Sequence, residues 1–166
     1  MRAIALNHVS IPAADMEESV RFYKECFGME EIPAPRFGFG RPVHWLRLGD
    51  LQLHLFPVDE LPPRSAQHFG LEVDDFAAAY RALKESGIFS PAGERAPAAV
   101  WELPGGEGQM YFRDPAGNLV EIDCPDLSAY DPEVFGDDLR RLSDDIEQSP
   151  ENLRARLSFP GERSAV

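Results

Sequence analysis

Two stretches of this chain share one pattern: HVSIPAADMEESVRFYKECFG at residues 8–28 and HFGLEVDDFAAAYRALKESG at residues 68–87. Each opens with alternating residues around a histidine, which predicts a β-strand. An aspartate follows as a favoured helix N-cap, and then come apolar residues at helical spacing. A glycine suited to a left-handed C-cap closes each segment. We therefore predict two equivalent strand–helix units, with helices at residues 16–27 and 76–86.

Each unit is followed by hairpin signals. Residues 45–56 and 110–123 both read as strand, tight turn and strand, with Gly49-Asp50 and Gly117-Asn118 at the turns. The repeat pairs His8 with His68, and His54 with Glu121. We predict an α+β fold of two modules, residues 1–58 and 66–124, each a strand, a helix and a few antiparallel strands.

Residues 125–166 form a separate acidic extension, with five basic and ten acidic side chains. The boundary is placed at Cys124-Pro125, because proline ends regular structure. Within the extension, Asp131-Pro132 and Ser149-Pro150 resemble helix starts followed by apolar residues near helical spacing. The pattern predicts a helical tail of two short helices.

The composition limits the partners. The 166 residues carry a net charge of -13, which argues against nucleic acid and anionic membrane surfaces, because both require a cationic face. No apolar run is long enough to cross a bilayer. The two cysteines, Cys26 and Cys124, do not make a disulfide framework, so we expect a cytoplasmic protein with reduced thiols.

Four polar residues lie opposite apolar stripes in the expected strands. Alternation places His8, His54, His68 and Glu121 on the second face of their strands. Three imidazoles and a carboxylate suit a divalent cation such as Zn, Ni, Fe, Mn or Co. We predict one such ion per site, with His54 open to the alternative of a solvated or supporting residue.

Four further residues are candidate substrate contacts. Ser10 and Glu72 share faces with the expected ligands, and Tyr111 lies on the strand before Glu121. Arg47 offers a cation to an anionic substrate. Each has an ordinary alternative: a surface position for Ser10 and Glu72, packing for Tyr111, and an ion pair for Arg47.

Four segments carry a resemblance to a known family: residues 6–11 (LNHVSI), 19–24 (SVRFYK), 67–75 (QHFGLEVDD) and 112–122 (FRDPAGNLVEI). Across residues 3–124 the chain resembles the vicinal oxygen chelate superfamily of glyoxalases, bleomycin resistance proteins and extradiol dioxygenases. The resemblance implies paired βαβββ modules forming a cupped mixed sheet around a divalent metal. It places ligands at His8, His68 and Glu121, while His54 falls where the family often has Glu or Gln.

The resemblance implies several functions. In a lyase or isomerase like glyoxalase I, the metal chelates adjacent oxygens of a small substrate and stabilises an enediolate, with Glu121 as ligand and general base. The alternative is an extradiol-type Fe(II) dioxygenase using His8, His68 and Glu121. Thiol transfer to a phosphonate is disfavoured, because the chain after Glu121 is acidic.

A non-enzymatic alternative is a ligand-binding protein of the bleomycin-resistance kind, for which the acidic surface suits a cationic ligand. The family also implies a homodimer, in which one site draws its ligands from one chain or from both. The sequence does not decide between an enzyme and a ligand-binding protein, or between a site formed by one chain and a site shared by two.

Overall fold

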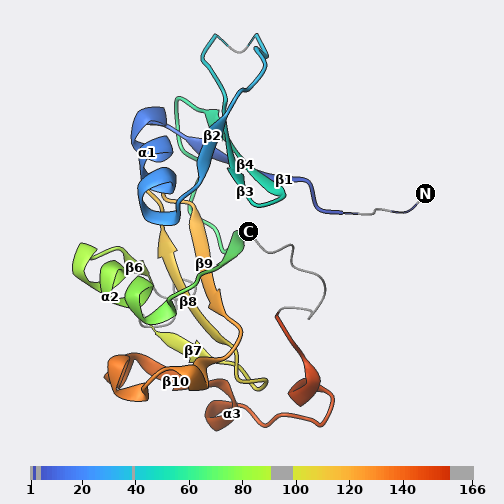
Figure 1. The fold of residues 1–166 in the computed structure, drawn as a ribbon, viewed down its shortest axis with the longest axis vertical. Helices are drawn as coiled ribbons and strands as arrows, with labels where there is room; N and C mark the ends of the chain where they lie inside the picture. Colours follow the sequence, from blue (N-terminus) through green and yellow to red (C-terminus); the bar gives the residue numbers. More distant parts are fainter. Residues whose placement is uncertain (1, 3–4, 39, 91–98, 158–166) are drawn as a thin grey trace. The chain divides into compact units, whose positions relative to one another are not determined.

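The computed structural model describes residues 2, 5–38, 40–90 and 99–157. The chain divides into two compact units. Unit 1 comprises residues 1–64 with the turn at residues 114–118, and unit 2 comprises residues 65–113 and 119–165. Each unit has its own sheet and one long helix (Figure 1).

Unit 1 follows the predicted order of strand, helix and strands. Its elements are β1 (His8–Ala13), α1 (Met16–Phe27), β2 (Glu30–Ile32), β3 (His44–Leu48) and β4 (Leu51–Pro57). The sheet order is β1-β4-β3-β2, with β1 parallel to β4 and the other pairs antiparallel. Helix α1 contacts β2, β3 and β4, so it covers one face and leaves the other to the candidate ligands.

Unit 2 repeats this arrangement. Its elements are β5 (His68–Glu72), α2 (Phe76–Ser86), β6 (Phe89–Ser90), β7 (Val100–Glu102), β8 (Gly108–Arg113), β9 (Leu119–Cys124) and β10 (Leu139–Arg141). The sheet order is β10-β7-β8-β9-β5, and β6 also pairs with β8. Strand β5 runs parallel to β9, as β1 does to β4. The α+β class and the repeated βαβββ modules are therefore confirmed.

Both long helices have the predicted ends. The Asp15 carboxylate accepts from the backbone N–H of Glu18, and the Asp75 carboxylate accepts from that of Ala78. These bonds satisfy N–H groups that the first helical turn leaves without partners. Gly28 and Gly87 end the helices at φ of 62° and 72°, a conformation that a side chain disfavours.

The alternation of the strands also appears in the burial of β4 and β9. Leu53, Leu55, Val120 and Ile122 are buried at 4% exposure or less, as expected for the helix-facing side. Leu51, at the same alternate positions of β4 as Leu53 and Leu55, is 43% exposed, because it begins the strand directly after the turn of the hairpin.

The turn between β8 and β9 belongs to unit 1. The Tyr23 hydroxyl donates to Asp114 Oδ2 over 2.8 Å, and Asn118 Nδ2 donates to the Pro12 carbonyl over 2.9 Å. Burial and the Asp114 carboxylate raise the pKa of Tyr23 well above its usual value, so the phenol stays a donor. These contacts give a structural reason for Asp114 and Asn118 in the segment of residues 112–122.

The extension differs from the two helices that the sequence predicts. Residues 127–138 form three single 3₁₀ turns, Leu127–Ala129, Pro132–Val134 and Gly136–Asp138. The chain then enters β10, a four-residue helix α3 (Leu142–Asp145) and a last turn at Asn152–Arg154. Gly136 at φ 52° interrupts the first expected helix. Burying Phe135 and pairing β10 with β7 stabilise the irregular path instead.

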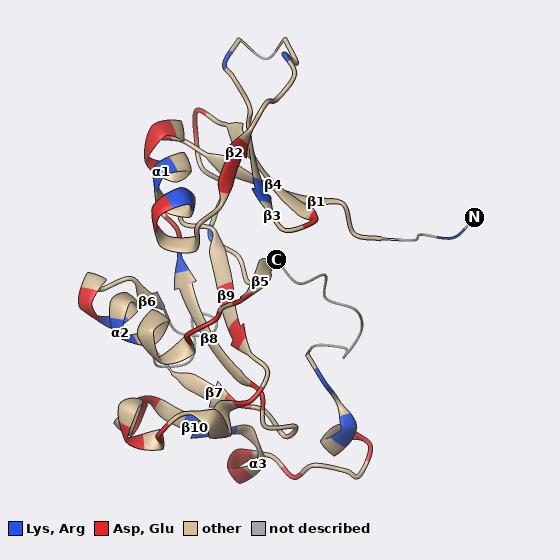
Figure 2. Cartoon of the chain, in the orientation of Figure 1, with Lys and Arg blue, Asp and Glu red and all other residues tan. Residues whose placement is uncertain are grey.

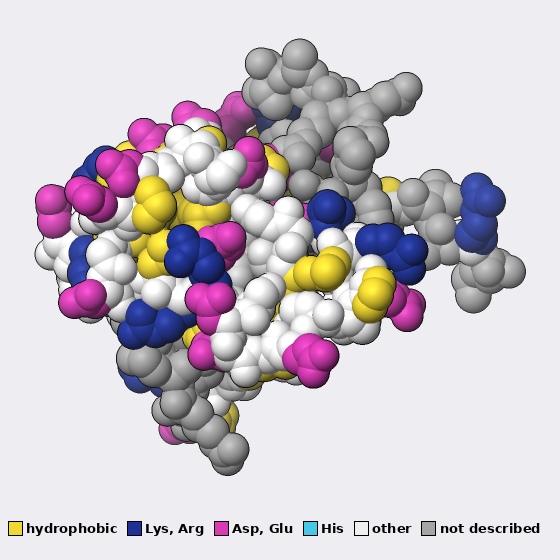
Figure 3. All heavy atoms as spheres, turned by 90° about the horizontal axis from the view of Figure 1, so that it is seen from below, with side chains coloured by type: hydrophobic (Ala, Val, Ile, Leu, Met, Phe, Trp, Pro, Cys, Tyr) yellow, Lys and Arg dark blue, Asp and Glu magenta, His cyan; other side chains and the backbone are white. Residues whose placement is uncertain are grey.

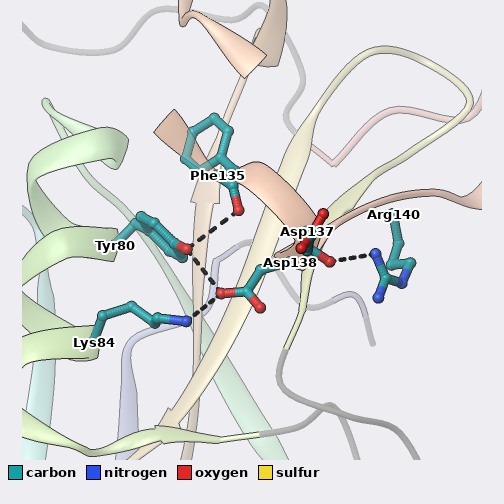
Figure 4. Close-up of polar contacts among 6 residues, drawn as sticks. All are labelled: Tyr80, Lys84, Phe135, Asp137, Asp138 and Arg140. Atoms are coloured by element: carbon teal, nitrogen blue, oxygen red, sulfur yellow. Dashed lines mark hydrogen bonds and ion pairs between the residues drawn. The ribbon is translucent and has the colours of Figure 1, made fainter. Parts of the chain in front are cut away.

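The extension is anchored to α2 by a polar cluster (Figure 4). Asp138 Oδ2 accepts from the Tyr80 hydroxyl over 2.8 Å and from Lys84 Nζ over 2.5 Å. Tyr80 also donates to the Phe135 carbonyl over 3.3 Å. The Phe135 ring, 2% exposed, packs against the rings of Phe76 and Tyr80.

Charged residues of both signs are spread along the elements of each unit (Figure 2). On the face in Figure 3, basic and acidic side chains are interspersed with apolar ones rather than gathered by sign. Among the described residues, no helix has both the length and the apolar character needed to cross a membrane.

Candidate metal centre

Strand register brings the predicted residues to equivalent places in the two sheets. In unit 1, Ser10 lies opposite His54, which in turn lies opposite Trp45. In unit 2 the same cross-strand row is Gly70, Glu121 and Tyr111. His8 and His68 each lie two residues before the first member of the row. The pairing of His8 with His68 and of His54 with Glu121 thus holds in the register of the sheets.

In unit 2 the histidine and the carboxylate meet directly. His68 Nε2 lies 2.7 Å from Glu121 Oε2. The other ring nitrogen, Nδ1, lies 2.8 Å from the Ala66 carbonyl and donates to it, because a carbonyl oxygen only accepts. That bond fixes the ring and leaves Nε2 directed at the carboxylate, the arrangement usual for a metal-binding histidine.

The Glu121 carboxylate is 5% exposed and surrounded by polar groups. Gln109 Nε2 donates to Oε1, the oxygen that does not face His68. Tyr111 hydrogen-bonds to the same carboxylate, and its ring meets the His68 ring edge to face at 5.5 Å. Burial, and then the negative charge of Glu121, raise the pKa of Tyr111, so its hydroxyl remains a donor.

A second carboxyl group lies beside Glu121. Burial, followed by the hydrogen bond and charge of Glu121, raises the pKa of Asp123 to about 8, although a hydrogen bond from Gln109 opposes the rise. Asp123 Oδ1 is buried and has no hydrogen-bond partner among the described residues. Gly70 makes room for this group, since a Cβ there would lie 2.7 Å from Asp123 Oδ2.

In unit 1 three aromatic rings form a stack. The His54 ring lies 4.3 Å from that of His8 and 4.4 Å from that of Trp45, with interplanar angles of 14° and 6°. His54 is 6% exposed, and its pKa is lowered, first by burial and then by the charge of His8. The neutral imidazole is the form that binds a metal.

One nitrogen of each of the two histidine rings, His8 and His54, already makes a hydrogen bond. His54 Nε2 donates to Gln52 Oε1 over 2.8 Å, and His8 Nδ1 donates to Asn7 Oδ1 over 2.9 Å. Amide oxygens only accept, so these two nitrogens are donors, and Nδ1 carries the lone pair of the neutral His54 ring.

The predicted substrate contacts lie in varied surroundings. Ser10 is exposed on β1, and Glu72 is exposed on β5 opposite Asp123. Tyr111 is half-buried against Glu121. Arg47 makes an exposed ion pair with Glu30 at 2.6 Å.

Taken unit by unit, the candidate ligands are of the types that a borderline divalent ion prefers: imidazole nitrogens in unit 1, and an imidazole with a carboxylate in unit 2. His8 and His54 belong to unit 1, and His68 and Glu121 belong to unit 2. Within the ranges that the structure describes, no three His, Cys, Asp or Glu side chains converge as a metal site.

The sequence interpretation missed Gln109, Asp123 and the stacking partner Trp45. Strand alternation was the available signal, because Gln109 and Asp123 each lie two residues from a residue already chosen on the same strand. Their contacts depend on which residues face each other across strands, and the linear pattern does not contain that information.

Residues 5–122 match the model of the Glyoxalase/Bleomycin resistance protein/Dioxygenase superfamily. Glyoxylase I 4 of Arabidopsis thaliana is 28% identical over 132 residues, covering 74% of this chain and 72% of the relative. Glutathione transferase FosA of Serratia marcescens is 27% identical over 134 residues, covering 75% of this chain and 84% of the relative.

Among solved structures, the oxidase ChaP-H2 is similar with a TM-score of 0.57 and 26% identity, covering 74% of this chain and 94% of that one. The family model spans both modules and all four predicted ligands, and it stops before the extension. The chain belongs to the glyoxalase, bleomycin resistance protein and dioxygenase superfamily.

Proposed function

We propose that this protein is a divalent-metal-dependent enzyme, a lyase or isomerase like glyoxalase I, acting on a small substrate with adjacent oxygen atoms. The proposed ligands are His8, His68, Glu121 and His54. The observation that supports this best is the 2.7 Å approach of His68 Nε2 to Glu121 Oε2, in a register that unit 1 repeats. The relative named Glyoxylase I 4 supports the same reaction class.

When bound, the ion acts as a Lewis acid that polarises the substrate oxygens. On loosening from the metal, the Glu121 carboxylate would take a proton from the carbon beside one of these oxygens and return it to the carbon beside the other. Tyr111 donates to the Glu121 carboxylate, while Ser10, Glu72 and Arg47 contact the substrate.

We further propose that residues 1–124 form the metal-binding part, that residues 125–166 are an added extension, and that the protein is a homodimer. Light scattering coupled to gel filtration tests the assembly, with an expected mass of twice the 18.5 kDa of one chain. A single-chain mass would contradict the dimer. It would leave the ligand set unaffected.

The first experiment measures metal content in protein purified without a tag or chelator. We expect about one divalent ion per chain, lost in Glu121→Gln, because a ligand has been removed. Hemithioacetal isomerisation is then assayed in metal-loaded and metal-stripped protein. Failure to take up Zn, Ni, Co, Mn or Fe(II) would overturn the enzyme proposal and favour a ligand-binding protein of the bleomycin-resistance kind.

A second candidate is an extradiol-type Fe(II) dioxygenase. It is favoured by the engagement of His54, whose ring lies between two others and whose Nε2 is bonded to Gln52. If His54 stays outside the ligand set, His8, His68 and Glu121 are the two histidines and one carboxylate typical of such iron sites. Oxygen uptake with a catechol after anaerobic Fe(II) loading tests this candidate, and activity that persists in His54→Asn would support it.

A further inference from the structure

Glu121 presents its two oxygens to different partners. Oε2 faces His68 Nε2 at 2.7 Å, and Oε1 accepts a hydrogen bond from the side-chain amide of Gln109. Gln109 lies on β8 opposite Asp123, so it reaches Glu121 diagonally across the strand pair. All of these residues belong to unit 2.

The Gln109 amide also hydrogen-bonds to Asp123. A side-chain amide has two N–H donors, which is the number needed to bridge two neighbouring carboxyl groups. The Gly70 position leaves Asp123 the space to lie there. Gln109 is therefore held by its own contacts rather than by packing alone.

The bond to Oε1 restricts the rotation of the carboxylate. A buried carboxylate without donors is costly, and with one oxygen held, the other has a defined direction. In each unit a glutamine side chain holds a candidate ligand, as an acceptor in unit 1 and as a donor in unit 2. Gln52 Oε1 accepts from the neutral His54 ring, whereas Gln109 Nε2 donates to the anionic Glu121.

We propose that Gln109 is a positioning residue that holds the Glu121 carboxylate with Oε2 directed at the metal. This inference rests on the proposed function, because it assigns Gln109 a part in metal binding. Groups that orient metal ligands typically change metal affinity about 10- to 100-fold when removed.

The test is a titration of metal-free protein with Co²⁺, followed by visible absorption. Gln109→Met keeps the length of the side chain and removes both donors. Trp101→Phe is the matched control, because Trp101 lies directly opposite Gln109 on β7 and its indole N–H has no hydrogen-bond partner among the described residues. Melting of the metal-free proteins checks that each variant is folded.

We expect Gln109→Met to bind Co²⁺ about 10- to 100-fold more weakly, with an altered ligand-field spectrum. The variant should still unfold cooperatively, at a lower temperature than the wild type, because the buried Glu121 carboxylate loses a donor. Trp101→Phe should match the wild type. Wild-type affinity and spectrum in Gln109→Met, with binding lost in Glu121→Gln, would overturn the role of Gln109 and leave the proposed function standing. Absence of Co²⁺ binding in the wild type would overturn both.

Discussion

His54 and Glu121 occupy the same place in the two sheets: each lies opposite a small residue of a parallel first strand, Ser10 or Gly70. Their surroundings differ: those of His54 favour an uncharged ring, and those of Glu121 favour a negative charge. Burial, and then the charge of His8, favour a neutral imidazole at His54, whereas hydrogen bonds from Gln109 and Tyr111 stabilise the Glu121 carboxylate. One repeated backbone thus supports two kinds of candidate ligand.

Two substitutions distinguish His68, which is predicted to bind metal, from His44, which makes a structural contact. His68→Ala should abolish metal retention, because it removes the nitrogen that faces Glu121 Oε2 at 2.7 Å. His44→Ala is the control, since His44 Nδ1 instead pairs with Glu31 Oε1 at 2.7 Å. Metal analysis of the two variants checks this, and equal metal content in both would contradict the assignment of His68.

The ring stack should depress the pKa of His54. In metal-free protein we expect NMR titration to give a value below 6.5, because the buried ring resists protonation and His8 lies beside it. The unfolded chain then takes up this proton first, so the stability contributed by neutral His54 is lost as pH falls below about 6.5.

Trp45→Leu opens one face of that stack. Its effect should be to move the His54 pKa back toward the ordinary value, with a loss of about 1 kcal/mol of unfolding free energy. An unchanged pKa for His54 in this variant would show that the Trp45 ring does not determine it.

The extension should be part of the folded core of unit 2. Phe135→Ala removes a ring that is 2% exposed and packed against Phe76 and Tyr80, so we expect a loss of about 3 kcal/mol in urea unfolding. Leu153→Ala, at a position 46% exposed, should change stability by less than about 0.5 kcal/mol. Similar effects of the two substitutions would contradict this packing.

The anchor at Asp138 should weaken in acid. Burial alone would raise the pKa of Asp138, but hydrogen bonds from Lys84 and Tyr80 outweigh it and hold the pKa below its usual value. The stabilisation is therefore complete above the unfolded pKa near 4 and is lost as pH falls through the lower folded value.

Asp138→Asn should lower the free energy of unfolding by about 1 kcal/mol at neutral pH, a modest loss because the carboxylate is partly exposed. The loss should be small near pH 2, where Asp138 is protonated in the wild type as well. Asp137→Asn is the matched control, since Asp137 contributes its backbone carbonyl to Arg140. Denaturant unfolding across this pH range checks both, and parallel pH profiles for the two variants would refute the anchor.

The sequence by itself determined the two modules, the bounds of both long helices and the face of each candidate ligand. These features follow from local signals, namely the strand period of two, the aspartate N-caps and the glycine C-caps. The pairing of His8 with His68 and of His54 with Glu121 followed from the repeat alone.

Only the tertiary structure decided which side chains meet across strands and what the extension becomes. Gln109 reaches Glu121 because β8 and β9 pair in one register, and no short-range pattern specifies that register. The extension had helical spacing, yet Leu139–Arg141 became a strand because β7 offered backbone partners and α2 offered a buried place for Phe135. Tertiary burial and strand pairing outweighed a local helical preference, because propensities are small beside the free energy of burying an aromatic ring.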